Sequence, residues 1–254
     1  MNTDLPAYVV IGAAGGIGSA VCRILGGKGA RLFLVGQTAT KLQALAEELK
    51  TASPIGEYLT HTADATKSAD IETSFSEATA AFGPLAGAAN LVGSILLKPA
   101  HLTTDAEFEQ TLQLNTYSAF YTVRAAARAM MATGGSIVLA STVATRIGLI
   151  NHEPIATAKG AVNGLVISAA ATYASKNIRV NAVAPGLVRT PLAAKLTSSE
   201  MALKASTAMH PLGRIGEPDD VAAAICWLLD PATTWVTGQL IGIDGGLSTV
   251  KAKG

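Results

Sequence analysis

Short apolar runs rich in β-branched residues alternate along the chain with longer segments of helical periodicity. Such runs predict strands, and the periodic segments predict amphipathic helices. The predicted strands are Ala7–Ile11, Arg31–Val35, Gly56–His61, Leu85–Asn90, Ser136–Ala140, Arg179–Val183 and Gln239–Ile243. The predicted helices are Gly16–Leu25, Thr40–Leu49, Ala69–Ala80, Asp105–Met131, Pro154–Ala174 and Pro218–Leu229. This alternation predicts βαβ units, and hence a mostly parallel, seven-stranded sheet with helices on both faces.

The chain is expected to form a single domain over residues 1–254. No proline- or serine-rich linker, internal repeat or low-complexity tract divides its 254 residues, and 49% of them are hydrophobic. One α/β domain of the doubly wound class commonly reaches this size. We therefore expect one continuous sheet rather than two separate units.

Charge and cysteine usage exclude several classes of function. The formal net charge is +1 without runs of like charge, which argues against a nucleic-acid partner or an anionic membrane surface. Cys22 and Cys226 lie in apolar helical patterns and are expected to be inert core thiols, and no metal-ligand spacing occurs. Glycines interrupt the apolar stretch Ala7–Cys22, which follows Asp4 and Pro6, and no uninterrupted apolar run could span a bilayer. These features predict a cytoplasmic protein without a membrane segment.

A glycine-rich turn follows the first predicted strand. Gly12, Gly16 and Gly18 lie between that strand and the next helix, with Ala14 and Ile17 in the same loop. A strand that ends in glycines at a helix N-terminus brings backbone N–H groups and the positive end of the helix dipole to a pyrophosphate. Glycine is required there because a Cβ would block the tight turn and the close approach. The loop predicts binding of NAD(H) or NADP(H).

The spacing Gly-x-x-x-Gly-x-Gly occurs together with further motifs along almost the whole chain. These are Asp64-Ala65, Asn90-Leu-Val-Gly93, Asn115, the segment Asn181–Thr190 with Pro185-Gly186, Thr237–Gln239 and Asp244–Gly246. In this combination and order, the sequence resembles the short-chain dehydrogenase/reductase family, whose fold is of the Rossmann type. The resemblance implies an oxidoreductase that transfers hydride between a nicotinamide cofactor and a substrate.

The resemblance also implies where the cofactor is held. By their positions in the motifs, Asp64 and Ala65 would bind the adenine, with Asn90 and Gly93 below it. The residues implied to meet the nicotinamide are Pro185, Gly186, Val188 and Thr190.

The second strand ends in Gly36-Gln37-Thr38, where relatives that prefer NAD commonly have an acid. No carboxylate therefore repels a 2′-phosphate, and Gln37 and Thr38 can donate hydrogen bonds to one. The arginine common in NADP binders is missing, and Gly15 replaces a basic residue often found in the glycine loop. We predict a preference for NADP(H) over NAD(H), because the missing acid removes the main obstacle to the phosphate.

The catalytic segment departs from the family pattern. The resemblance implies Ser, Tyr and Lys, assisted by Asn115, with Tyr and Lys one helical turn apart. Lys159 is present, but Ile155 occupies the Tyr position and Thr142 the Ser position. No tyrosine lies between Tyr121 and Tyr173. Thr142 retains a hydroxyl that can orient a carbonyl, whereas Ile155 cannot exchange a proton.

His152 is the nearest side chain that could replace the missing tyrosine. Imidazole titrates near neutral pH, and Glu153 could orient the ring. The alternative is that both residues only cap the helix that begins at Pro154, where an acid is favourable in any case. Lys159 has a second possible role, which is to bind the cofactor ribose alone. A water held by Asn115 and Lys159 is a further candidate for the proton relay.

The segments expected on the substrate side are mostly apolar or small. They are Ser94–Leu97, the residues Ile147, Leu149 and Ile150, and Leu187–Met209. The last segment corresponds to a lid in the family, but Leu192, Leu196 and Leu203 also fit a helix stripe packed on the sheet. Lys98 and Arg146 could meet an acidic substrate or could simply be solvated.

Two functions remain open from the sequence. The first is an NAD(P)(H)-dependent oxidoreductase acting on a small carbonyl or alcohol with an atypical site. The second is a catalytically silent NADP(H)-binding sensor or scaffold. Redox-neutral chemistry, as in halohydrin dehalogenases, is disfavoured because those relatives lose the glycine loop and keep the tyrosine. A homo-oligomer, either a tetramer or a dimer, is implied through Asp105–Met131 and Pro154–Ala174, whose small residues could alternatively pack on the sheet.

Overall fold

The computed structural model describes residues 5–251, and its strands form one seven-stranded sheet. All neighbouring strands are parallel, in the order β3-β2-β1-β4-β5-β6-β7. The strands are β1 (Ala7–Ile11), β2 (Arg31–Gly36), β3 (Tyr58–Thr62), β4 (Gly87–Asn90), β5 (Gly135–Ala140), β6 (Ile178–Pro185) and β7 (Leu240–Ile243). The prediction of a doubly wound parallel sheet is confirmed.

The order of the strands reverses between β1 and β4. β1 pairs with β2 on one side and with β4 on the other, so that Ile11 lies between Val35 and Asn90. The chain therefore leaves the sheet in opposite directions from these two central strands. In open parallel sheets this reversal opens a crevice at the carboxyl ends of the strands, and ligands bind there.

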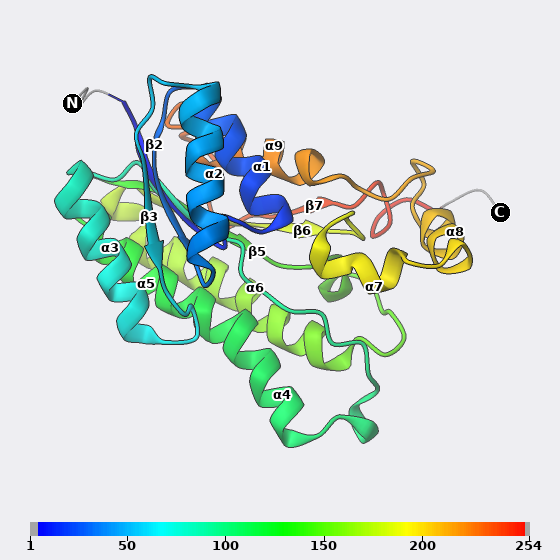
Figure 1. Cartoon of the computed structure of the whole chain (residues 1–254). Helices are drawn as coiled ribbons and strands as arrows, with labels where there is room; N and C mark the ends of the chain where they lie inside the picture. Colours follow the sequence, from blue (N-terminus) through cyan, green and yellow to red (C-terminus); the bar gives the residue numbers. More distant parts are fainter. Residues whose placement is uncertain (1–4, 252–254) are drawn as a thin grey trace.

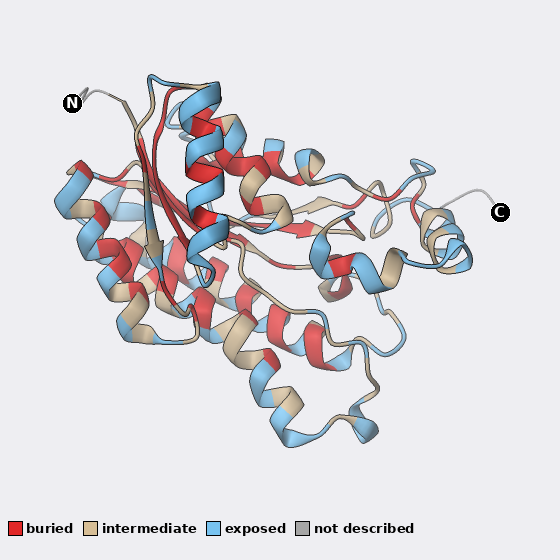
Figure 2. Cartoon of the chain, in the orientation of Figure 1, coloured by how far each residue is buried: buried red, intermediate tan, exposed pale blue. Residues whose placement is uncertain are grey.

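Helices cover both faces of the sheet (Figure 1). One face carries α1 (Gly16–Gly27), α2 (Ala39–Ala52) and α9 (Pro218–Leu229). The other carries α3 (Ser68–Phe82), α5 (Ser118–Met130) and α6 (Glu153–Tyr173). A separate hydrophobic cluster fills the space between the sheet and each helical layer. The buried helix faces turn toward the sheet (Figure 2).

The predicted elements occur with small shifts at their ends, except for the long helix at 105–131. That stretch consists of α4 (Asp105–Leu112), a π-helical turn (Gln113–Tyr117) and α5. Hydrophobic periodicity detects the continuous helical path but not the change in winding. Single π-turns inside α-helices are frequent at functional sites, and this one contains the buried Asn115.

Two helices beyond the carboxyl ends of the strands have no counterpart in the predicted elements. They are α7 (Ala194–Thr197) and α8 (Glu200–Met209), which lie beside each other in Figure 1. Neither has a buried residue, and Leu192 is 55% exposed. The alternative that Leu192, Leu196 and Leu203 form a stripe packed on the sheet is wrong, as the exposed surface of α8 in Figure 2 also shows.

The helical stretch Glu153–Lys176 is long and apolar enough to cross a membrane by length and composition. In the fold it contains α6, which packs against β6 and buries Val162 and Val166 in the core. A core helix passes the same criterion without spanning a membrane. Its composition is therefore explained by the packing of the sheet.

Candidate functional site

A cleft of about 310 Å³ lies at the carboxyl ends of β1 and β4, where the strand order reverses. Of the residues predicted to bind a cofactor, the cleft brings eight together, from five separate segments. They are Gly12, Gly16, Ile17, Gly18, Gln37, Ala65, Gly93 and Thr190. Ala14 is only partly buried and lies in the same loop, outside the lining of the cleft.

The N-terminus of α1 is free to receive an anion. Its N-cap residue Gly15 makes no side-chain cap bond, and the first turn contains no acid. Within residues 5–251, the backbone N–H groups of Gly16, Ile17 and Gly18 have no hydrogen-bond partner. Unsatisfied donors at a helix start are the arrangement that binds a pyrophosphate. The residues present therefore fit the phosphates of a dinucleotide.

The glycines of the loop are required by the close packing there. Gly12 has a φ of +81°, a left-handed conformation that disfavours other residues. A Cβ on Gly18 would overlap the carbonyl oxygen of Gly12. A Cβ on Gly16 would lie 2.8 Å from the methyl carbon of Thr190, so the loop after β6 rests directly on the phosphate loop.

Gln37, which lines the cleft, meets Asp64, which lies outside its lining. The Gln37 amide donates to the Asp64 carboxylate at 3.3 Å. The same oxygen accepts from the hydroxyl and the backbone N–H of Thr66, and these bonds hold the pKa of Asp64 below its ordinary value. Asp64 is therefore an anion with a fixed orientation. Thr38, the N-cap residue of α2, makes no side-chain cap bond and is outside the lining of this cleft.

Asn90 has a supporting position under the cleft. Its amide is buried, donates to Thr122 at 2.9 Å, and accepts from the N–H of Val92 at 2.9 Å. These bonds fix the turn after β4 to α5. Gly93, in the same turn, packs closely against two of the predicted catalytic residues. A Cβ there would lie 2.8 Å from the Asn115 oxygen and 3.3 Å from Lys159 Nζ.

Lys159, Asn115 and Ser94 are grouped around Gly93. Asn115 donates to the Ser94 hydroxyl at 2.9 Å and accepts from the Ser94 N–H at 3.2 Å. The buried Lys159 amine donates to the carbonyl of Ala140 at 2.8 Å. Among residues 5–251 no carboxylate pairs with Lys159, and burial lowers the pKa of the amine from 10.5 to about 8.

The hydroxyl of Ser94 is a feature that the sequence alone did not single out. It accepts from Asn115, and within the described chain its own proton has no acceptor. The signal in the sequence was only a polar residue directly after Gly93, in a segment predicted as an apolar or small lining. Its orientation depends on the π-helical turn that places Asn115.

Thr142 and Ile155 lie on either side of the turn that leads into α6. The Thr142 oxygen accepts from the N–H of Ala144 at 3.3 Å and retains its own proton for another acceptor. Ile155 is 5% exposed and packs in the core at the start of α6. The side chain at the expected tyrosine position is thus part of the apolar packing.

His152 is the N-cap residue of α6, directly after Asn151, whose φ is +62°. Its Nδ1 bonds to the carbonyl of Ile150 at 2.8 Å, which leaves Nε2 without a partner in the described chain. The ring is therefore oriented by a backbone carbonyl and not by Glu153. The structure does not support the hypothesis that Glu153 orients the ring, because Nδ1 is bonded to Ile150 and no bond joins Glu153 to the imidazole within the described chain.

The loop after β6 extends from the sheet to the phosphate loop. Val188 is buried and pairs with Gly216 in an isolated parallel bridge, while Thr190 lines the cleft. Pro185 ends β6 and Gly186 lies outside the cleft, against the imidazole of His210. Only the far end of this predicted cofactor segment therefore reaches the cleft.

The two cations that could have met an acidic substrate both lie near acidic side chains. Lys98 pairs with Glu107 at 2.8 Å. The Arg146 guanidinium lies against Gly242 and beside Asp244, whose pKa is lowered mainly by Ser248 and Gly246 and also by Arg146. Neither supports recognition of an acidic substrate.

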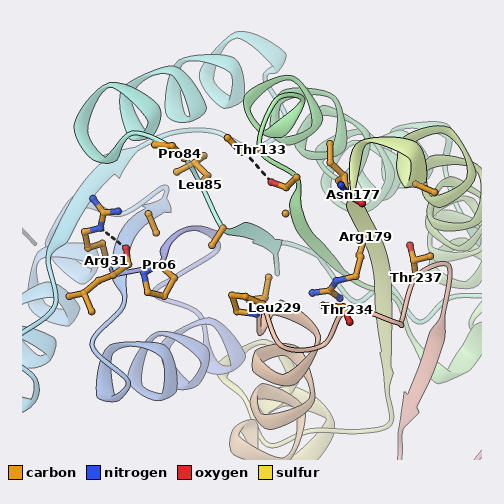
Figure 3. Close-up of a pocket in the computed structure, with 18 of the residues that line it drawn as sticks. Pro6, Arg31, Pro84, Leu85, Thr133, Asn177, Arg179, Leu229, Thr234 and Thr237 are labelled. Atoms are coloured by element: carbon orange, nitrogen blue, oxygen red, sulfur yellow. Dashed lines mark hydrogen bonds between the residues drawn. The ribbon is translucent and has the colours of Figure 1, made fainter. Parts of the chain in front are cut away.

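A cavity of about 830 Å³ lies at the opposite end of the sheet (Figure 3). Residues at or next to the starts of β1, β2, β5 and β6 line it, so it is remote from the reversal of strand order. Arg179 donates there to the backbone carbonyls of Val236 and Asp230, and Arg31 donates to Leu5 and Phe82. These guanidiniums hold loops at the amino edge of the sheet. Among the described residues, no group of three or more His, Cys, Asp or Glu is placed to hold a metal.

Comparisons with known proteins agree with this geometry. The family described as "Enoyl-(Acyl carrier protein) reductase" matches residues 12–248. Galactitol 2-dehydrogenase (L-tagatose-forming) of Cereibacter sphaeroides is 36% identical, over 96% of this chain and 95% of its own length. Cis-4-hydroxycyclohexanecarboxylate dehydrogenase of Sinomonas cyclohexanicum is 34% identical, with 95% and 96% covered.

Solved structures show the same similarity. A short-chain type dehydrogenase/reductase from Mycobacterium ulcerans has a TM-score of 0.92 and 31% identity, with 97% of this chain and 91% of that chain covered. An actinorhodin polyketide ketoreductase variant with NADPH has a TM-score of 0.92 and 26% identity, with 98% and 99% covered. The fold and cleft define a Rossmann-type oxidoreductase. The chain belongs to the short-chain dehydrogenase/reductase family and is an NAD(P)-dependent oxidoreductase.

Proposed function

We propose that this protein transfers hydride between NADP(H) and a small carbonyl or alcohol, with an active site that works without the usual tyrosine. The observation that carries the proposal is the uncapped N-terminus of α1, whose free N–H groups share one cleft with Gly93. Beside Gly93 lie the buried amine of Lys159 and the Asn115–Ser94 pair. When bound, the nicotinamide supplies or accepts the hydride.

Thr142 and Lys159 have distinct proposed roles. Thr142 donates its free hydroxyl proton to the substrate oxygen and so orients the carbonyl. The Lys159 amine is the cation nearest Gly93 and binds the ribose hydroxyls, for which two of its three donors remain available. Its lowered pKa also lets the amine release a proton near neutral pH.

The proton has two proposed routes. In the first, His152 exchanges it directly through Nε2, which is unpaired while Nδ1 is held by Ile150. In the second, it passes through a water held by Asn115, Lys159 and the Ser94 hydroxyl. Substitution of His152 separates the routes, because only the first route uses the imidazole.

The proposed substrate is small and largely uncharged around its reacting oxygen. Apolar side chains from three segments remain exposed on this side of the fold. They include Ile95 (38% exposed), Leu97 (37%), Ile150 (88%) and Leu192 (55%). Leu192 lines the cleft itself, and exposed apolar groups at a site favour a ligand with apolar surface. In this proposal α7 and α8 act as the lid over that ligand.

A preference for NADP(H) is supported by the end of β2. No acid stands there to repel a 2′-phosphate, and the Gln37 amide is fixed by its bond to Asp64. A similar structure contains NADPH. Asp64 itself accepts three hydrogen bonds, so its negative charge is partly compensated.

A catalytically silent NADP(H)-binding sensor or scaffold is the second candidate. The specific observation in its favour is Ile155, which is packed in the core at the position of the family's proton donor. This candidate keeps every feature of the cofactor cleft and lacks turnover. It predicts that NADP(H) binds tightly while no carbonyl compound is reduced.

We also propose that the protein forms a homo-oligomer, a tetramer or a dimer, through α5 and α6. The small residues of α5 are buried in the core, but Gly160 and Gly164 of α6 face open space. Ile167 and Phe120 are 58% and 50% exposed on the same two helices. Such a surface permits close approach of helices from a second subunit. A cytoplasmic location stays a prediction.

The proposal is tested by binding first and turnover second. NADPH and NADH are titrated into the purified protein, and an aldehyde and ketone panel follows with the wild type and His152→Ala. We expect tighter binding of NADPH, measurable oxidation of it, and a strong loss in His152→Ala if the first route operates. Tight binding without oxidation would support the silent binder, and absence of binding would contradict both candidates.

A further inference from the structure

His210 lies at the C-terminal end of α8 and is 4% exposed. Its Nδ1 lies 2.7 Å from the carbonyl oxygen of Ser206, one turn earlier in the same helix. Its Nε2 accepts from the backbone N–H of Leu187 at 3.3 Å. Since a backbone N–H can only donate, Nε2 must be unprotonated and the ring proton must be on Nδ1. The geometry thus defines a neutral imidazole with one tautomer.

His210 bonds the extended segment Leu187–Arg189, in which successive residues point their backbone N–H and C=O groups to opposite sides. Leu187 and Arg189 both bond to Gly216, through the Leu187 oxygen at 2.9 Å and the Arg189 N–H at 2.8 Å. In extended backbone the peptide groups of the residue between them point the other way. The N–H of Val188 accordingly has no partner within the described chain. His210 and Gly216 therefore hold one edge of the loop, and the free N–H of Val188 points from the opposite edge.

Glycine at position 186 is what allows this contact. A Cβ on Gly186 would lie 2.6 Å from Nε2 of His210 and 3.2 Å from the Cα of Asp244. A Cβ added to Gly245 would lie 3.7 Å from the ring carbon Cδ2 of His210, so the turn after β7 lies next to the ring. The imidazole is thus enclosed between α8, the loop 185–190 and the turn after β7.

We propose that His210 is a positioning residue that anchors the nicotinamide-facing loop 185–190 and couples it to α8. This inference rests on the proposed function and on the expectation, implied by the family resemblance, that Pro185, Gly186, Val188 and Thr190 meet the nicotinamide ring. A second proton on the imidazole places an N–H donor against the N–H of Leu187, and the anchoring bond is lost. The free N–H of Val188 then loses its fixed direction, so acidification weakens binding of the nicotinamide half alone.

The charged groups around His210 have partners of their own. Asp244 accepts from Gly246 and from Ser248, and Arg214 pairs with Asp220 at 2.6 Å. Both ring nitrogens of His210 bond backbone groups and no carboxylate. On α8 itself the charged residues Glu200 and Lys204 are exposed, and Arg146 lies close enough to Asp244 to help lower the pKa of that carboxyl. The proposed effect of acidification on nicotinamide binding therefore depends on the bond from Leu187 to His210 and not on an ion pair.

The test compares two ligands that differ in the nicotinamide. NADP⁺ and 2′,5′-ADP are titrated calorimetrically at about pH 8 and about pH 5.5, on either side of the range in which imidazoles change charge. The measured quantity is the affinity for NADP⁺ divided by the affinity for 2′,5′-ADP. Both ligands carry the 2′-phosphate, so the protonation of that phosphate cancels in this ratio. We expect this ratio to fall about five- to tenfold on acidification of the wild type, the effect of one lost hydrogen bond.

Two variants complete the test. His210→Leu cannot accept from Leu187 and should show the reduced ratio at both pH values. His210→Gln can place an amide oxygen near the position of Nε2 and should keep the high ratio at both. A wild-type ratio that does not change with pH would overturn the proposal without any substitution. If neither ligand binds the wild type, the proposed function itself fails, whereas binding of both with no effect of His210 refutes only the present inference.

Discussion

The amine of Lys159 donates to the carbonyl oxygen of Ala140 at 2.8 Å and has no anionic partner in the described chain. Ala140 ends β5 and Lys159 lies in the second turn of α6, so the bond joins the sheet to the helix that follows it. A buried cation held only by a carbonyl is costly for the fold, and burial lowers its pKa to about 8. Because burial of the Lys159 ammonium lowers the stability of the fold, we infer that this lysine serves cofactor binding and not stability.

Replacement of this lysine should stabilise the protein. In the unfolded chain the amine has its ordinary pKa, so between about pH 8 and 10.5 the unfolded state binds a proton that the folded state lacks. The free energy of unfolding of the wild type therefore rises with pH across this window, and below it the full penalty is present. Lys159→Met should raise the free energy of unfolding at neutral pH by up to roughly 3 kcal/mol and remove this rise. Urea denaturation of both proteins at several pH values measures the difference, and a less stable Met variant would contradict it.

The Ser94 hydroxyl should matter for proton transfer more than for binding. Because Asn115 donates to its oxygen, the Ser94 proton is free to bond a water or the substrate oxygen. Ser94→Ala should lower kcat about tenfold or more while the Kd for NADPH changes little. Steady-state kinetics and calorimetry separate the two effects. Equal losses in kcat and cofactor affinity would show instead that Ser94 only maintains the shape of the loop after β4.

Restoration of the family's tyrosine tests whether the atypical site limits the rate. Ile155→Tyr places a phenol one helical turn before Lys159, where the cation can lower its pKa. The larger ring enters a packed position and should cost about 1–3 kcal/mol of stability. We expect faster carbonyl reduction than in the wild type. Ile155→Phe is the matched control, because it has the same bulk and cannot donate a proton. Equal rates in the two variants would exclude the phenol as the cause.

The parts of the fold and site set by local pattern were predictable. The β-branched runs predicted the strands and the parallel sheet, and the glycine motif predicted the loop between β1 and α1, because these sequence signals are local and repeated. The grouping of Ser94 with Asn115 was not predictable, since it depends on the π-helical turn at Gln113–Tyr117. The contact between His210 and Leu187 likewise joins residues that are distant in sequence and carry no shared motif.

The packing of the segment after β6 was predictable only in part. Leucines at helical spacing occur both on helices packed against a sheet and on helices of a lid, and spacing alone does not separate them. For α8 the structure shows no buried residue, which removes the first alternative. The role of Glu153 was not predictable either, because the sequence does not show which group the His152 ring bonds, and in the structure this is the carbonyl of Ile150.

Cofactor preference should respond to the residue after β2. The Gln37 amide already bonds Asp64, so a guanidinium at this position can be held by the same carboxylate while it faces a 2′-phosphate. Gln37→Arg should tighten binding of NADPH about tenfold and leave binding of NADH nearly unchanged. Gln37→Leu, which removes the donor without adding charge, is the control. Parallel changes for NADPH and NADH in the Arg variant would show that Gln37 does not lie near the phosphate.

The last prediction concerns two glycines on the same helix. A Cβ on Gly18 would overlap the carbonyl oxygen of Gly12, whereas a Cβ on Gly27 would meet nothing within 4 Å. Gly18→Ala must therefore displace the phosphate loop or the start of α1, and we expect a large loss of both stability and cofactor affinity. Gly27→Ala should be neutral or stabilising by up to about 1 kcal/mol, because alanine is the better helix former. Thermal unfolding with and without NADPH measures both effects. A Gly18→Ala protein that binds NADPH like the wild type would mean that the loop can move without cost, and the steric basis of the phosphate site would be wrong.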